Sequence, residues 1–241
     1  MQGLDKYLTM NITELVEPIR YNKTLNPKLW DHDRLKSEVR GALLRIAEDF
    51  KEFVGVPMQV VDIVIYGGNV NYNYTNKSDL DLHLVVDMST IQCDREAHEL
   101  FDSKRRLYKR KHDIQIHGIE VELYIEDVNE TPVSSSYSVL RGEWISKPNP
   151  DMPKYDHEQV ARMVKVWQII FQHAVKSGDL QTCRNAVNLL RKYRQLGLKT
   201  PQAEFSVPNL VFKSLRNDDT LAGMMTLIDR LHDNELSITQ Q

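Results

Sequence analysis

Apolar residues recur every three or four positions between residues 31 and 54. The repeating positions are Leu35, Val39, Leu43, Ile46, Phe50 and Phe53. This spacing places them on one stripe of a helix. Gly55 and Pro57 follow, and both residue types are common just beyond the end of a helix. We therefore predict a helix from Asp31 to Val54 with one buried face.

The two apolar segments that follow have the composition and spacing of strands. The first, MQVVDIVIYG at residues 58–67, is rich in β-branched residues and stops at a glycine. The second, SDLDLHLVVD at residues 78–87, alternates polar and apolar residues at period two. We predict two strands joined by a glycine-containing connection.

A helix and more strands are predicted for the next part of the chain. Residues 91–111 have a helical pattern and end in KRRLYKRK, with six basic residues in eight. IQIHGIEVELYIED, residues 114–127, is interrupted at Gly118 and then alternates as a strand does. SSYSVLRGEWI, residues 135–145, is also rich in strand-forming residues. The α/β region is therefore expected to end near Ile145.

The remainder of the chain has only helical patterns. SKPNPDMPKYD, residues 146–156, has three prolines and no periodic apolar signal, as a linker or long loop does. Apolar stripes at helical spacing then begin near Val160, Leu180, Leu210 and Leu221, which predicts about four helices. We predict an α+β protein with an α/β domain over residues 1–147 and a helical domain over residues 148–241.

Overall charge favours neither nucleic acid nor a membrane as the partner, because 31 Lys and Arg residues balance 34 Asp and Glu residues. No segment has the roughly 18 consecutive apolar residues of a membrane span, and the first residues lack the pattern of a signal peptide. We expect a cytoplasmic protein. Cys93 and Cys183 have no spacing that indicates a disulfide framework or a zinc site, so each is expected to be a buried thiol.

Acidic residues share one face of the strand predicted at residues 78–87. In a strand, Asp79, Asp81 and His83 point to one side while the intervening leucines point to the other. Two rises of ~3.3 Å separate the aspartate Cα atoms by roughly 6.6 Å, so the carboxylates can share a cation or hold two cations. The simpler alternative is the solvated polar face of an edge strand. For His83 we favour a structural contact with a carboxylate over a metal or phosphate contact.

Two further features strengthen the hypothesis of a site. Gly67 and Gly68 end the preceding strand, and a glycine turn allows backbone N–H groups to approach a phosphate closely. A tight turn after a strand is the alternative. The second alternating strand places Glu120, Glu122 and Tyr124 on one face, and a third carboxylate from it could join the aspartates if the strands are neighbours. Spacing does not choose between the two glutamates.

This ordered set of strand, Gly-Gly turn, Asp-x-Asp strand and later acidic strand resembles the nucleotidyltransferase superfamily of the DNA polymerase β type. More narrowly, it is similar to nucleotidyltransferase-like proteins predicted in tailed phages and bacteria. The likeness lies in NPKLWD (26–31), SDLDLH (78–83) and VELY (121–124), and more loosely in FSVPNLVFKSLRND (205–218). It implies a mixed β-sheet with flanking helices, followed by an all-helical C-terminal domain.

The resemblance also implies roles for individual residues. It assigns nucleotide binding to Gly67 and Gly68, and catalysis with binding of Mg²⁺, or Mn²⁺, to Asp79, Asp81 and Glu122. Glu120 is the reserve for the third acid. Asn69, next to the glycines, is a candidate nucleotide contact. Many relatives have Ser where Gly68 stands and Asp where Glu122 stands, so an inactive descendant is an alternative.

The function implied is transfer of a nucleoside monophosphate from a nucleoside triphosphate, such as ATP, to an acceptor hydroxyl with release of pyrophosphate. The acceptor could be RNA, another protein, a small molecule or a second nucleotide. The basic segment Lys104 to Lys111 could contact a nucleic-acid backbone, or could complement the negative end of a helix dipole. A silent nucleotide- or nucleic-acid-binding module and a metal-dependent hydrolase are the alternatives. In a phage-encoded protein, the site of action would be the host cytoplasm.

Overall fold

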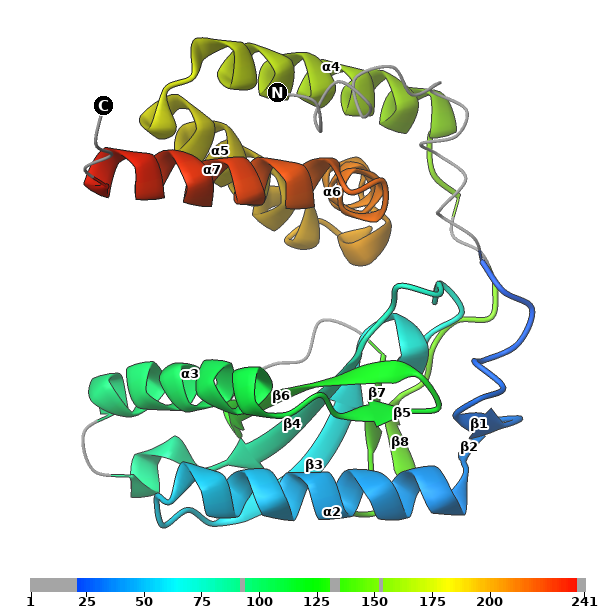
Figure 1. Ribbon diagram of the computed structural model, residues 1–241. Helices are drawn as coiled ribbons and strands as arrows, with labels where there is room; N and C mark the ends of the chain where they lie inside the picture. Colours follow the sequence, from blue (N-terminus) through cyan, green and yellow to red (C-terminus); the bar gives the residue numbers. More distant parts are fainter. Residues whose placement is uncertain (1–20, 92–93, 131–134, 152–153, 238–241) are drawn as a thin grey trace. The chain divides into compact units, whose positions relative to one another are not determined.

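The computed structural model describes residues 21–91, 94–130, 135–151 and 154–237 (Figure 1). The described residues divide into two compact units, one before residue 152 and one after residue 153, and each unit is described by itself. The first is a mixed α and β unit, and the second is helical. Cys93 lies outside the described residues, whereas Cys183 is a buried free thiol.

The α/β unit begins with a small hairpin that corrects the predicted start of the first helix. Strands β1 (Trp30–Asp31) and β2 (Arg34–Leu35) pair antiparallel, and helix α2 (Ser37–Val54) starts after them. His32, in the hairpin turn, has a φ of 55°, a left-handed value that a right-handed helix does not accommodate. The C-terminal end of α2 is as predicted, because Gly55 follows it with a φ of 69°.

A six-stranded mixed sheet forms the centre of this unit, in the order β5-β6-β4-β3-β7-β8 (Figure 1). The strands are β3 (Val60–Tyr66), β4 (Leu80–Val86), β5 (Gln115–Ile116), β6 (Ile119–Asp127), β7 (Ser136–Ser138) and β8 (Glu143–Ser146). All neighbouring pairs are antiparallel except β4 and β6. Helix α3 (Asp94–Lys111) connects these two parallel strands, as a crossover between parallel neighbours requires.

The two faces of the sheet differ in chemistry. Leu80, Leu82 and Leu84 of β4 are buried in one core with apolar residues of α2 and α3. The opposite face has acids, tyrosines and serines, because the register places Tyr66, Asp81 and Glu122 side by side on β3, β4 and β6. The period-two alternation predicted the composition of both faces.

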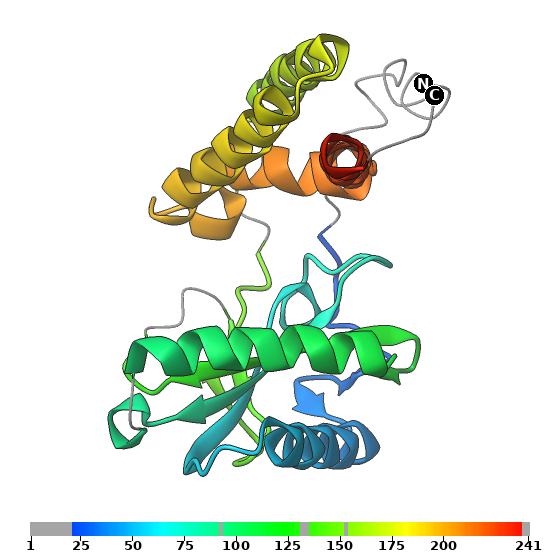
Figure 2. The same ribbon diagram turned by 60° about the vertical axis from the view of Figure 1, so that its left-hand side comes forward.

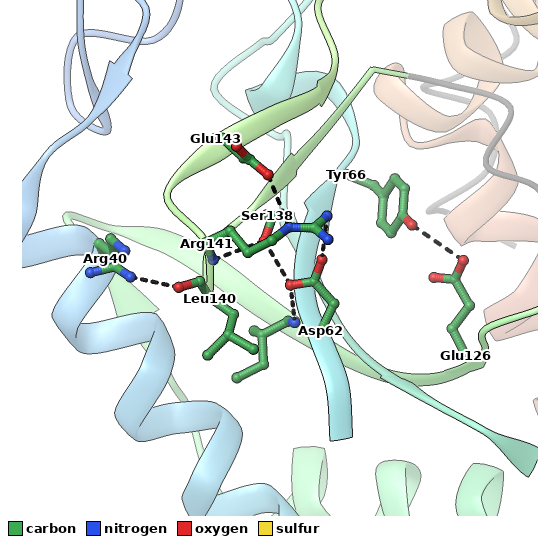
Figure 3. A network of polar contacts seen from close by, with 9 residues as sticks. Arg40, Asp62, Tyr66, Glu126, Ser138, Leu140, Arg141 and Glu143 are labelled. Carbon is green, nitrogen blue, oxygen red and sulfur yellow. Dashed lines mark hydrogen bonds and ion pairs between the residues drawn. The ribbon is translucent and has the colours of Figure 1, made fainter. Parts of the chain in front are cut away.

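Asp62 of β3 anchors the far end of this polar face (Figure 3). One carboxylate oxygen accepts hydrogen bonds from Ser138 Oγ at 2.6 Å and from the backbone N–H of Ile63 at 2.8 Å. The other lies 2.8 Å from Nη2 of Arg141, whose Nε is 3.1 Å from Glu143. These contacts join β3 to the β7–β8 hairpin.

The helical unit contains α4 (His157–Ser177), α5 (Leu180–Leu198), α6 (Val207–Asn217) and α7 (Thr220–Leu236), as the apolar stripes predicted (Figure 2). Asp156 caps α4 and Asp179 caps α5 through side-chain hydrogen bonds to backbone N–H groups. Trp167, Phe171, Leu190 and other apolar side chains form a core separate from that of the sheet. Within the described parts of the chain, no helix is long and apolar enough to cross a membrane.

Candidate functional site

Three carboxylates converge at one end of the polar face of the sheet. Asp79, Asp81 and Glu122 each offer an oxygen atom, and these atoms lie within 4.8 Å of one another. All three residues are partly buried. Carboxylates so close together repel one another, which favours a cation or a proton between them. The arrangement can therefore bind a metal ion.

The parallel pairing of β4 and β6 selects the third acid of this group. Asp81 is the register partner of Glu122, so their side chains point to the same face on neighbouring strands. Glu120 is paired with Gln115 on the outer strand and is exposed. Glu122, and not Glu120, thus joins the two aspartates. We refer to Asp79, Asp81 and Glu122 as the acid triad.

The glycine turn lies directly against the triad. Gly67 has a φ of 92° and a ψ of −170°, a conformation that residues with a side chain rarely adopt. A Cβ atom at Gly67 would lie 2.6 Å from Oδ2 of Asp81. A Cβ atom at Gly68 would lie 3.1 Å from Oγ of Ser78. Gly67 is therefore required both by the backbone and by the space that the Asp81 carboxylate occupies.

Asn69 holds this turn to the start of β4. It is fully buried, and its side-chain amide donates hydrogen bonds to the backbone carbonyls of Ser78 at 2.9 Å and of Asp79 at 2.8 Å. In the structure the side chain thus positions Asp79 relative to the glycines. The nucleotide contact predicted for Asn69 stays a prediction.

Two further hydrogen bonds, which the sequence did not predict, hold the same turn. Asn26 Nδ2 donates to Oδ1 of Asn69 at 2.8 Å, and Trp30 Nε1 donates to its backbone carbonyl at 2.8 Å. Both donors belong to the segment NPKLWD, residues 26–31, for which the sequence indicates a family resemblance but no contact. The spacing of Asn26 and Trp30 does not predict these contacts, because their partner Asn69 is about 40 residues away in the sequence.

Both oxygens of Glu122 accept hydrogen bonds from neighbouring side chains. Lys109 of α3 bonds to Oε1, and the Tyr124 hydroxyl donates to Oε2 at 2.7 Å. Burial disfavours the charged form of Glu122, but the bonds from Lys109 and Tyr124 outweigh burial and lower the pKa of this carboxyl. Burial and the bond to Glu122 raise the pKa of Tyr124, so its hydroxyl stays a donor.

The basic segment Lys104 to Lys111 makes several contacts within its own unit. Lys104 and Lys111 each lie 5.5 Å from the ring centre of Phe53. The guanidinium of Arg105 lies 4.7 Å from the ring centre of Tyr124. Lys109 bonds to the acids of β6. The nucleic-acid contact remains a prediction, and the segment already serves to bring positive charge to the triad.

His83 lies two residues beyond Asp81 among aromatic and acidic side chains. Its Nδ1 atom is 2.7 Å from Oε2 of Glu126, and Glu126 Oε1 accepts from the Tyr66 hydroxyl at 3.2 Å (Figure 3). The ring stacks on Tyr124 at 4.6 Å between centroids. His83 thus contacts a carboxylate, which is the structural role favoured from the sequence. Its ring also packs against the ring of Tyr124.

The triad has the donor chemistry that Mg²⁺ and Mn²⁺ prefer. These ions bind oxygen ligands, and Asp79, Asp81 and Glu122 supply carboxylate oxygens from two adjacent strands. Gly67 leaves space beside the Asp81 carboxylate, and a Cβ atom at this position would fill that space. The residues present therefore fit a divalent cation.

No protein-family model and no curated protein matches the chain. Among solved structures, it aligns with a STING-associated CdnE c-di-GMP synthase from Capnocytophaga granulosa. The two chains are 12% identical, and the alignment covers 93% of this chain and 98% of that chain with a TM-score of 0.22. At this TM-score the alignment shows neither a shared fold nor a shared activity.

Proposed function

We propose that the protein is a nucleotidyltransferase that uses Mg²⁺ or Mn²⁺ and has a nucleotidyltransferase-type fold in its α/β unit. In this proposal it moves a nucleoside monophosphate from a nucleoside triphosphate to an acceptor hydroxyl and releases pyrophosphate. The observation that carries the proposal is the convergence of Asp79, Asp81 and Glu122 next to the Gly67–Gly68 turn. A cation site and an anion-approachable turn together suit a triphosphate with its metals.

Each residue has a role that its position supports. Asp79 and Asp81 would hold the metal, and Glu122 would complete the ligand set or accept the proton of the attacking hydroxyl. A bound divalent metal would neutralise phosphate charge and lower the pKa of the nucleophile. Gly67 and Gly68 would let the backbone approach the triphosphate, while Asn69 fixes the distance between this turn and Asp79.

Labelling with triphosphates tests this function. Wild-type protein, incubated with Mg²⁺, a cell extract and each of the four triphosphates carrying a labelled α-phosphate, should transfer label to an acceptor that mass spectrometry then identifies. Asp79→Asn combined with Asp81→Asn should abolish labelling without unfolding the protein, because neither residue belongs to the apolar core. Equal labelling by this variant would refute the assignment.

A second candidate is a nucleotide-binding module that transfers nothing. It is favoured by the hydrogen bonds that engage both oxygens of Glu122, since this acid must give up or share a partner to bind metal. Calorimetry distinguishes the two candidates. Binding of triphosphate with metal, in the absence of transfer to any acceptor in the extract, would support the silent module.

The remaining expectations belong to the same proposal. The α/β domain over residues 1–147 would be catalytic, and the helical domain over residues 148–241 would contribute to substrate choice, which the fold alone does not determine. RNA, a protein, a small molecule and a second nucleotide are the acceptor classes that the labelling experiment separates. Action in the cytoplasm is also retained as a prediction.

A further inference from the structure

We propose that Lys109 is a built-in counter-ion of the acid triad, which a divalent metal must displace from Glu122 before the site is complete. The inference rests on the proposed metal-dependent function and adds a regulating residue to it. Lys109 would be a positioning residue, because it acts through Glu122 and not on the substrate. It comes from α3, the crossover helix that makes β4 and β6 parallel neighbours.

The contacts of Lys109 support this role. Its ammonium bonds to Oε1 of Glu122 and lies 2.9 Å from Oε1 of Glu120. Glu122 is a member of the triad, and Glu120 is not. One lysine thus joins a site carboxylate to a neighbouring carboxylate outside the site.

The charges explain why a cation occupies this place. Three carboxylates with oxygens within 4.8 Å of one another are destabilised by repulsion when no positive charge is near. The ammonium of Lys109 supplies one positive charge at the edge of the triad. A divalent ion supplies two charges at its centre, so the ion and the lysine compete for the same carboxylate.

Exposure of the side chains makes the exchange feasible. The Lys109 side chain is 52% exposed, whereas that of Glu122 is 21% exposed. An ion pair that is open to water on the lysine side contributes little to stability, so breaking it does not unfold the unit. Because Glu120 already contacts the ammonium, Lys109 can leave Glu122 and keep one ionic partner.

Mn²⁺ affinity of the nucleotide-free protein tests the inference. Electron paramagnetic resonance measures free Mn²⁺ during a titration of wild type, Lys109→Met and Lys109→Arg. Lys109→Met should bind Mn²⁺ about tenfold more tightly, the factor that one unit charge exerts on a divalent ion at about 6 Å in water. Lys109→Arg keeps the charge and should stay within about twofold of wild type.

Arg110→Met is the matched control. Arg110 is exposed and adjacent in sequence, so the control removes the same charge from the same helix about 100° around its axis. It should change Mn²⁺ affinity much less than Lys109→Met. Thermal melting, with Lys109→Gln as a second neutral variant, verifies that the proteins compared are folded.

Each outcome bears on the inference or on the function separately. Equal or weaker Mn²⁺ binding by Lys109→Met and Lys109→Gln, beside measurable binding by wild type, overturns the counter-ion role and leaves the metal-dependent function standing. An equal gain in Mn²⁺ affinity by Arg110→Met also overturns the counter-ion role, because removing any positive charge from this helix would then have the same effect. Tighter binding by Lys109→Met without any nucleotidyl transfer by wild type refutes the transferase and retains the counter-ion. Absence of Mn²⁺ binding in every variant overturns both.

Discussion

Two acidic clusters lie on the same face of one sheet, and their surroundings differ. Around Asp62, each carboxylate oxygen has a donor within 2.8 Å, supplied by Ser138, Ile63 and Arg141 (Figure 3). In the acid triad, by contrast, oxygens of three carboxylates lie within 4.8 Å of one another. The neighbours of Asp62 are a hydroxyl, a backbone N–H and a guanidinium, whereas each carboxylate of the triad also has two other carboxylates close to it.

The number of neighbouring carboxylates distinguishes an acid with only structural partners from acids that can also bind a cation. A buried carboxylate with a full set of donors contributes to structure, and removing it leaves those donors without a partner. Converging carboxylates repel one another and raise the free energy of the empty site, which a cation lowers. Burial alone does not distinguish the two cases, because the Asp62 side chain is only 8% exposed and lies outside the triad.

Substitution of the glycine next to the triad should have the largest effect. Gly67→Ala places a methyl group 2.6 Å from Asp81 Oδ2 and forces alanine into a φ of 92°. We expect a loss of about 3 kcal/mol in the free energy of unfolding, the upper end for backbone strain of this kind, together with weaker Mn²⁺ binding. Urea denaturation and Mn²⁺ titration measure the two effects.

Gly118→Ala is the control for Gly67→Ala. Gly118 also has a positive φ, of 76°, but a Cβ atom there would have no neighbour within 4 Å among the described residues. We expect it to cost about 1 kcal/mol and to leave Mn²⁺ affinity unchanged. Equal effects of the two substitutions on Mn²⁺ binding would show that Gly67 does not keep space for Asp81.

Asp62→Ala should affect stability and spare the metal site. It removes the acceptor of Ser138, Ile63 and Arg141, and because Arg141 is half exposed we expect a loss of about 2 kcal/mol, below the range for a fully buried ion pair. Asp81→Asn should show the reverse pattern, with unfolding free energy unchanged or higher and Mn²⁺ binding lost. A large loss of stability in Asp81→Asn would remove the distinction between the two clusters.

Tyr124→Phe should have the smallest effect, and it depends on pH. The pKa of Glu122 lies below its ordinary value of 4.5, in part because of the bond from Tyr124. Glu122 therefore stabilises the fold above pH 4.5 and loses this contribution as pH falls through the lowered pKa of the folded state. We expect Tyr124→Phe to cost about 1 kcal/mol at pH 7 and less once the pH falls below the lowered pKa of Glu122.

Thermal melting of wild type and Tyr124→Phe between pH 7 and pH 3 checks this dependence. The difference in melting temperature should shrink as the pH falls, because protonated Glu122 no longer gains from the hydroxyl. A difference that stays constant after Glu122 has been protonated would mean that the lost stability does not depend on the charge of Glu122, because Phe keeps the ring that stacks on His83.

Local sequence patterns predicted the elements well where the periodicity was strong. Alternation placed Asp81 and Leu82 on opposite faces of β4, and the apolar stripes located the helices. The first helix was predicted to start six residues early, at Asp31 instead of Ser37, because Leu35 fits its stripe but lies in the strand of a small hairpin. Periodicity counts apolar positions and does not detect the turn at His32.

The third acid and its neighbours required tertiary structure. Alternation made Glu120 and Glu122 equivalent, and only the register of β4 against β6 brings Glu122 beside Asp81. Likewise, the sequence presents Lys109 as one of six cations in a segment, whereas the path of α3 determines that it reaches the triad. Contacts between distant elements depend on strand order and crossover, which local patterns do not encode.

Calorimetric titration of Mn²⁺ into the nucleotide-free protein decides whether the acid triad binds a metal ion. Wild type and Asp62→Asn should show saturable binding, and Asp79→Asn combined with Asp81→Asn should show none while melting at the temperature of wild type or above it. Undiminished binding in the double variant, or its loss in folded Asp62→Asn alone, would contradict the assignment of the metal to Asp79, Asp81 and Glu122.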